Sequence, residues 1–328
     1  MPRFAIRTEV ALLGVIVLVG TVFSLFSPYF LTVANFAGLV ENYAVTTILA
    51  SGVFVVLVAG GVDISFAATA SVGQYVAAYA ASYYGWNPVA TIALACSVGF
   101  VLGAINALLT HYLRVVSIII TIATSSIYFA LLIHFTGGSE IYDLPEWWTT
   151  KITFARIDFA PGEFAKLSLP IVVMLVVVVL THLIMAHSRI GRQVYALGGN
   201  AESAKRLGVQ VLAVQVFVYG YLGVLAGIAG MLQAHRVGQA VPTAMQGTEL
   251  NVLAVAILGG ASLVGGIGTM PGVILGVFLL AILQNGLNLV GVSSYFFEVV
   301  IGLVILVSIT ATTLAERRAS RSHLRSAA

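Results

Sequence analysis

The sequence predicts an all-α integral membrane protein with about ten transmembrane helices and both termini in the cytoplasm. Of its 328 residues, 60% are hydrophobic and only 8% are charged, whereas globular proteins carry about 25% charged residues. The mean hydropathy is +1.05. Because a bilayer core about 30 Å thick needs about 20 apolar residues per helix, a chain of this length has room for about ten spans with short loops.

Each helix is placed from an apolar run between polar breaks. Arg3 and Arg7 precede the first run, as they would in a signal peptide, but no small-x-small cleavage site follows, so we interpret this run as an uncleaved helix. The eighth run is rich in glycine and predicts a short or broken helix. The expected spans are Val10–Phe26, Leu39–Ala59, Ile64–Tyr84, Val89–Thr110, Val115–Phe135, Leu169–Ala186, Leu212–Ala234, Leu250–Val264, Gly272–Leu289 and Tyr295–Leu314.

The basic residues orient these spans, since loops rich in Lys and Arg stay in the cytoplasm. With the N-terminus inside, 11 of the 15 Lys and Arg residues are cytoplasmic and 4 are outside. The cytoplasmic set is Arg3, Arg7, Arg114, Arg189, Arg192, Lys205, Arg206, Arg317, Arg318, Arg321 and Arg325, and the outer set is Lys151, Arg156, Lys166 and Arg236. Shifting the helix count by one before residue 188 would destroy this asymmetry.

The predicted organisation is one membrane domain over residues 1–315, followed by a basic cytoplasmic tail over residues 316–328. The domain contains a cytoplasmic loop over residues 188–211 and an extracytoplasmic loop over residues 136–168. The second loop can be an interfacial aromatic belt or part of a dock for a binding protein. The residues behind both interpretations are Glu140, Tyr142, Asp143, Glu146, Trp147 and Trp148.

The cytoplasmic loop predicts a short capped helix over residues 201–207. Asn200 can cap its start, Glu202 lies in the first turn, and Gly208 can close its end in the left-handed conformation. Such a helix is only about 10 Å long, and its three apolar residues, spaced three apart, are expected on one face. This arrangement favours docking on another protein, and the alternative is an ordinary basic connector.

The run GRQVYALGGNAESAKRLGV in this loop resembles the cytoplasmic coupling loop of the simple-sugar (ribose-type) permeases of bacterial ATP-binding cassette importers. The resemblance extends over residues 31–313. It implies that the loop inserts into a cleft of a separate ATPase subunit and carries its motion to the membrane helices. The residues it assigns to coupling are Arg189, Gly191, Arg192, Gly199, Asn200, Glu202, Ala204, Arg206 and Gly208.

Two glycine-rich motifs are also similar to this family. The first, GGVDIS, begins at Gly60, and the chain continues with FAAT where the family usually has Val-Gly-Ser. The second, LGGASLVGGIGTMPG, begins at Leu258 and precedes QNGLNL. Glycines allow tight breaks and close helix approach. The expected helix-break glycines are Gly60, Gly61, Gly259, Gly260, Gly265 and Gly266; the echo between the first and second pairs hints at two related halves without establishing a repeat.

The polar residues expected along a substrate pathway are Asp63, Ser65, Glu249, Asn251, Gln284, Asn285 and Asn288. Amide and carboxylate groups suit the hydroxyls of a sugar. Two other interpretations stay open: Asp63 can cap the third helix, and some of the amides can simply tie helices together.

The chain has no phosphate-binding G-x-x-x-x-G-K-[ST] motif, no catalytic constellation and no histidine or cysteine cluster for a metal. We therefore expect no cofactor in this chain, with ATP used by the partner, and helix-end basic residues explain the +3 charge better than nucleic acid does. The resemblance implies an ATPase subunit, an extracytoplasmic sugar-binding protein, a second permease chain, alike or related, and the bacterial inner membrane. The alternatives are a branched-chain amino-acid permease, or an ion-coupled transporter that uses Asp63 or Glu249.

Overall fold

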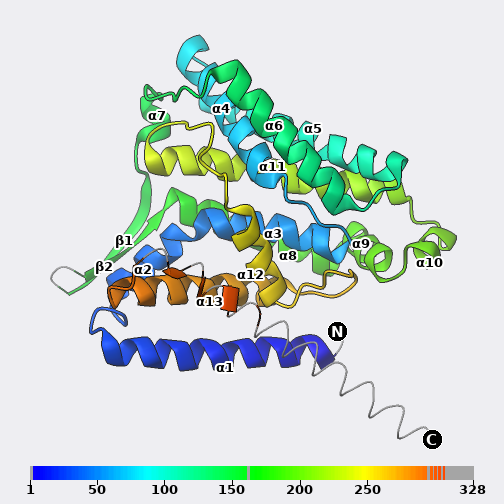
Figure 1. Ribbon diagram of the computed structural model, residues 1–328. Coiled ribbons are helices and arrows are strands. Elements are labelled where there is room, and N and C mark those ends of the chain that lie inside the picture. Colours follow the sequence, from blue (N-terminus) through cyan, green and yellow to red (C-terminus); the bar gives the residue numbers. More distant parts are fainter. Residues whose placement is uncertain are drawn as a thin grey trace, which may run out of the picture.

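The computed structural model describes residues 3–160, 163–293, 296–297, 299–300, 302–303 and 306. Most of the predicted tenth span and the whole basic tail therefore lie outside the described residues. The described part forms a bundle of helices with one β-hairpin at one end (Figure 1). Its elements are α1 (Arg3–Phe26), α2 (Val33–Asn42), α3 (Ala44–Val58), α4 (Phe66–Tyr84), α5 (Pro88–Leu113), α6 (Ser117–Thr136), α7 (Glu146–Thr149), β1 (Thr153–Ala160), β2 (Glu163–Ser168), α8 (Leu169–His187), α9 (Arg189–Gly199), α10 (Ala201–Arg206), α11 (Val211–Val237), α12 (Glu249–Leu258) and α13 (Met270–Leu289).

Six of the described helices are long and apolar enough to cross a membrane: α1, α5, α6, α8, α11 and α13. The bent pair α2–α3 raises this number to seven. The prediction of a helical, multi-pass membrane protein is therefore confirmed. The predicted short eighth helix is also present, because α12 has only 10 residues and ends at Leu258.

The second predicted span, Leu39–Ala59, is wrong as a single helix. It is two helices, α2 and α3, bent by 49° at Tyr43, which lies between them with φ −97° and ψ 5°. The hydroxyl of Tyr43 donates a hydrogen bond to Gln284 on α13. Two polar residues, Glu41 and Asn42, stand directly before the bend, but apolar residues on both sides of them led us to predict one continuous span.

The loop of residues 136–168, predicted to be extracytoplasmic, contains structure that we did not predict. A short helix, α7, is followed by the antiparallel hairpin β1–β2. Lys166 on β2 forms a 2.9 Å ion pair with Glu41 at the end of α2 and so ties the hairpin to the bundle.

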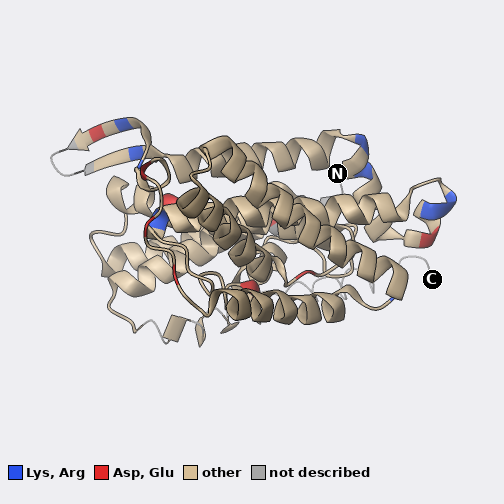
Figure 2. Ribbon diagram, turned by 90° about the horizontal axis from the view of Figure 1, so that it is seen from above, with Lys and Arg blue, Asp and Glu red and all other residues tan. Residues whose placement is uncertain are grey.

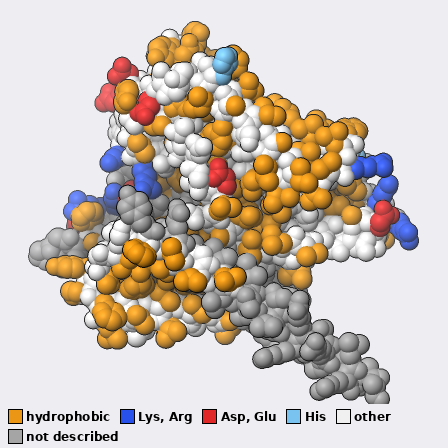
Figure 3. All heavy atoms as spheres, in the orientation of Figure 1, with side chains coloured by type: hydrophobic (Ala, Val, Ile, Leu, Met, Phe, Trp, Pro, Cys, Tyr) orange, Lys and Arg blue, Asp and Glu red, His pale blue; other side chains and the backbone are white. Residues whose placement is uncertain are grey.

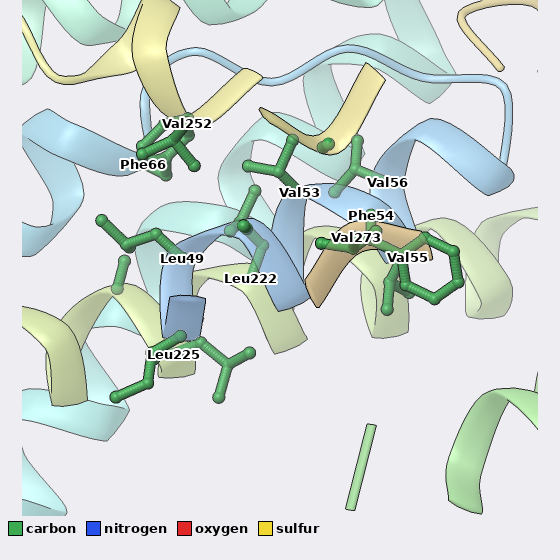
Figure 4. Packing of buried hydrophobic residues seen from close by; sticks show 14 of the residues in the cluster. Leu49, Val53, Phe54, Val55, Val56, Phe66, Leu222, Leu225, Val252 and Val273 are labelled. Atoms are coloured by element: carbon green, nitrogen blue, oxygen red, sulfur yellow. The ribbon is translucent and has the colours of Figure 1, made fainter. Parts of the chain in front are cut away.

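The core is built around α3, of whose 15 residues 14 are buried. A helix that is hydrophobic all round needs neighbours on every side, and α8, α11, α12 and α13 supply them. Figure 4 shows Leu49 and Val53 of α3 among Leu222 of α11 and Val252 of α12. In contrast, α1 lies along α13 and leaves its outer face exposed (Figure 1).

Candidate functional site

The predicted cytoplasmic loop folds into two helices, α9 and α10, which project from one end of the bundle (Figure 1). The first helix was missed. Ser188 caps it by accepting from the Gly191 N–H at 3.0 Å. A Cβ on Gly191 would overlap the carbonyl oxygens of Ile184 and Met185, so glycine permits the sharp turn from α8 into α9.

The predicted caps of α10 are confirmed. The Asn200 side chain accepts from the Ser203 N–H at 2.9 Å, Glu202 lies in the first turn, and Gly208 has φ +84°. The single apolar docking face is wrong, however. Ala204 is buried at 2% exposure, whereas Leu207 is 83% exposed, because Ala204 faces the rest of the chain and Leu207 lies just beyond the helix end.

The exposed side of α10 is therefore mostly charged. Glu202 and Lys205 line an open cleft of about 1250 Å³ together with Arg114, which follows α5. Arg189 and Arg206 are also exposed. A docking partner at this end would meet charged groups of both signs and the side chain of Leu207.

The two predicted helix breaks share one geometry. After α3 and after α12, the chain closes the helix with a Schellman motif, in which two successive N–H groups donate back to the last turn. Gly60 and Gly260 occupy the left-handed position, with φ +82° and +86°. The bonds, between 2.8 and 3.1 Å, run from Gly60 to Leu57 and Gly61 to Val56, and from Gly260 to Ile257 and Ala261 to Ala256. Gly60 thus corresponds to Gly260, one residue later than the sequence echo implied. The same motif also ends α10 and α13, so it does not establish a repeat.

A buried polar chain follows the first break. Asp63 is 3% exposed, and its Oδ1 accepts from both the N–H and the hydroxyl of Ser65 at 2.7 Å. The Ser65 hydroxyl in turn accepts from Asn106 Nδ2 on α5 at 2.7 Å. Because Ser65 precedes α4, Asp63 closes a turn before the helix and does not cap the helix itself. Asn106 was missed, since it lies within an apolar run.

The other predicted pathway residues lie elsewhere. Gln284 binds Tyr43, and Asn285 forms a reciprocal amide pair with Asn35. Glu249 and Asn251 are half-buried in the first turn of α12, and Asn288 is exposed. No described hydrogen bond joins these groups to the Asp63 chain. The pathway role of all seven residues stays a prediction.

The opposite end of the bundle carries α7 and the hairpin. Trp148 is 3% exposed and donates from Nε1 to the carbonyl oxygen of Met231 at 3.0 Å, so it is a core residue and not part of an interfacial belt. Tyr142, Asp143 and Glu146 are exposed, and Figure 3 shows acidic side chains gathered near α7. A hydrogen bond to the nearby Glu140 carboxylate, together with its charge, raises the pKa of Tyr142.

Within the described residues, no three His, Cys, Asp or Glu side chains come together in a group that could hold a metal ion. The fold is therefore that of a polytopic membrane protein. Its helix breaks after α3 and α12 lie close to the projecting loop that contains α9 and α10.

The chain belongs to the family described as "Branched-chain amino acid transport system / permease component", which it matches over residues 35–309. The family resemblance predicted from the loop and glycine motifs is confirmed. Similar proteins include the ribose import permease protein of Bacillus subtilis strain 168, which is 35% identical over 297 residues and 90% of each chain. The ribose import permease protein of Escherichia coli K12 is 32% identical over 312 residues and 92% of each chain. The D-allose transport system permease protein of Escherichia coli K12 is 29% identical over 305 residues, covering 92% of this chain and 91% of the relative. No solved structure matches.

Proposed function

We propose that this chain is the membrane-spanning permease subunit of an ATP-driven importer for a monosaccharide or a related polyol. The observation that carries the proposal is the similarity to ribose and D-allose permeases along about nine tenths of the chain. A galactose/methyl galactoside import permease protein of Haemophilus influenzae is also 31% identical over 88% of both chains. These relatives favour a sugar over a branched-chain amino acid, although the family description names the latter.

The loop of residues 188–211 is the proposed dock for a separate ATPase subunit. Its support is geometric: α10 is capped at both ends, projects from the bundle, and exposes Glu202, Lys205 and Leu207. In this proposal ATP is bound and hydrolysed by the partner, and the present chain binds no cofactor of its own.

The other proposed partners are assigned to the second end of the bundle and to its sides. An extracytoplasmic sugar-binding protein meets the end with Tyr142, Asp143 and Glu146, where acidic side chains steer a basic partner. A second permease chain, identical or related, completes the pore, and exposed apolar side chains on the rest of the bundle meet lipid (Figure 3). We further propose ten crossings of the bacterial inner membrane, with residues 1–315 as one domain and both termini in the cytoplasm.

The test is to tag the chain, extract it gently from native membranes, and identify its partners by mass spectrometry. A matched sample carries a Gly/Ser linker in place of residues 201–207. We expect an ATPase subunit to co-purify with the parent and to be lost with the linker, while the amount of extracted permease stays the same.

If the parent protein is extracted alone, the importer proposal fails. The ion-coupled alternative is then tested separately. It requires that uptake stop when the ion gradient is dissipated, and that replacing Asp63 or Glu249 abolish uptake.

A further inference from the structure

Glycines from three distant parts of the sequence meet at the end of the bundle that carries α9 and α10. Gly60 follows α3, one pair ends α9 (residues 198–199), and another pair lies between α12 and α13 (residues 265–266). A Cβ built on Gly198 would overlap the carbonyl oxygen of Val58 and lie 2.6 Å from the nitrogen of Gly266. A Cβ on Gly265 would lie 2.7 Å from the Cα of Gly60 and 2.9 Å from that of Gly198. We call this contact of three backbones the glycine junction.

Two hydrogen bonds hold the glycine junction. The Gly266 N–H donates to the carbonyl oxygen of Val58 at 2.8 Å and so joins the two helix breaks to each other. The hydroxyl of Tyr195 on α9 donates to the carbonyl oxygen of Gly268 at 2.8 Å and joins α9 to the second break.

The junction is well placed to carry motion. Gly198 is separated from α10 only by Gly199 and Asn200, so a displacement of α10 moves it almost directly. Backbone in direct contact with backbone leaves no side-chain rotamers to absorb a small shift, and close-packed interiors transmit strain. Gly198 contacts Val58 at the first break and Gly266 in the turn after the second, so α9 touches both breaks.

We infer that Gly198 is a positioning residue that transmits movement of the ATPase-bound loop to both helix breaks at once. This inference rests on the proposed function, in which α9 and α10 dock the ATPase. It adds that the transmission runs through one backbone contact, and that the breaks after α3 and α12 move together.

The chain contains a matched control. A Cβ on Gly38, in the helix α2 and away from the glycine junction, would meet nothing within 4 Å. Gly198→Ala and Gly38→Ala therefore make the same chemical change within a helix, and they differ in whether the new methyl group enters the glycine junction.

The readout does not depend on knowing the sugar. In a Cys96→Ser background, Val264→Cys places a thiol at a position that is 86% exposed in the second break. Its rate of labelling by a maleimide is measured in the purified complex without nucleotide and with ATP and vanadate, together with ATPase content and ATP hydrolysis. We expect at least a threefold, ATP-dependent change in rate in the parent and in Gly38→Ala. In Gly198→Ala we expect that change to vanish while the ATPase stays bound and active.

An unchanged ATP response in Gly198→Ala would overturn the inference and leave the proposed function intact. A parent complex without ATPase would overturn both. If Gly198→Ala yields no folded complex, Tyr195→Phe decides, because it removes only the hydroxyl that binds Gly268. We expect this variant to lose at least half of the ATP-dependent change, and a full response would overturn the inference.

Discussion

The amide side chains of Asn35 and Asn285 satisfy each other. Asn35 Nδ2 donates to Asn285 Oδ1 at 2.9 Å, and Asn285 Nδ2 donates back to Asn35 Oδ1 at 2.8 Å. Both residues are half-buried, and the pair joins the first turn of α2 to the last part of α13. An amide that loses such a partner without gaining water is left unpaired, which costs about 1–3 kcal/mol.

We predict that Asn285→Leu lowers the free energy of unfolding by about 1–3 kcal/mol, because it leaves the Oδ1 of Asn35 without its donor, while Nδ2 keeps its 2.8 Å bond to the carbonyl oxygen of Phe30. The double variant Asn35→Leu/Asn285→Leu should be more stable than the sum of the two single changes implies, since neither amide of the pair is left facing a leucine. The bond from Asn35 to the Phe30 carbonyl oxygen is lost equally in Asn35→Leu and in the double variant. Thermal unfolding of the four proteins in one detergent measures both effects, and strict additivity would contradict the pairing. Substrate affinity of the folded single variant then separates packing from a pathway role: a changed affinity is expected only if Asn285 also contacts substrate.

The polar chain around Asp63 could be predicted from the sequence only in part. Asp63 and Ser65 stand out because a glycine pair interrupts an apolar segment just before them. Asn106 is completely buried and donates to Ser65, yet it is a single polar residue within a long apolar run. The residues around Asn106 in the sequence do not show whether its amide binds a functional group or simply a neighbouring helix. Only the packing of α5 against the first break reveals its partner.

The close packing of α5 against α11 depends on glycine residues in both helices. A Cβ on Gly223 of α11 would overlap the carbonyl oxygen of Gly99 on α5, and a Cβ on Gly99 would overlap that of Gly223. Small residues at such crossings let membrane helices approach closely, where no hydrophobic force between helices exists.

We predict opposite effects of alanine at two helical glycines. Alanine is favoured over glycine inside a helix by about 0.5–1 kcal/mol, so Gly14→Ala in α1, where the new methyl group meets nothing within 4 Å, should leave the unfolding temperature equal or higher. Gly223→Ala should lower it, because α5 and α11 must separate. Thermal unfolding of both variants under identical conditions is the measurement. A Gly223→Ala protein as stable as the parent would show that the crossing tolerates a side chain.

Signals within a few residues predicted local structure well. The caps of α10 and the left-handed Gly208 are confirmed, and six of the ten predicted spans coincide with helices long and apolar enough to cross a membrane, because capping and hydropathy act locally. The bend at Tyr43, the helix α9 and the hairpin were missed. Each depends on partners distant in sequence: Gln284 for the bend, Val58 and Gly266 for the end of α9, and Glu41 for the hairpin.

Over the described part of the molecule, the Lys and Arg residues gather at the two ends of the bundle, whereas some Asp and Glu residues also lie in its middle (Figure 2). Lys166 and Arg236, both predicted to be extracytoplasmic, meet at the end of α2, where Lys166 pairs with Glu41 and Arg236 donates to the carbonyl oxygen of Asn42 at 2.9 Å. Arg114 and Lys205, both predicted to be cytoplasmic, line one cleft at the other end. The sequence-based division of basic residues thus coincides with a spatial division.

This division leads to a prediction about topology. In a Cys96→Ser background, a cysteine in place of Ser203 on α10 should resist a membrane-impermeant maleimide applied to intact spheroplasts, whereas one in place of Asp158 on the hairpin should react within minutes. Both positions are exposed in the structure, so the difference reports the side of the membrane and not burial.

Permeabilised cells are the control, because both cysteines must then react. The orientation follows from 11 cytoplasmic against 4 extracytoplasmic basic residues, since positive loops resist translocation. The opposite result, in which Ser203→Cys is labelled and Asp158→Cys is protected in intact spheroplasts, would mean that the orientation in the membrane is the reverse of the predicted one. It would place α9, α10 and the glycine junction outside the cell, where no ATPase subunit could reach them, and the importer proposal would fail with the topology.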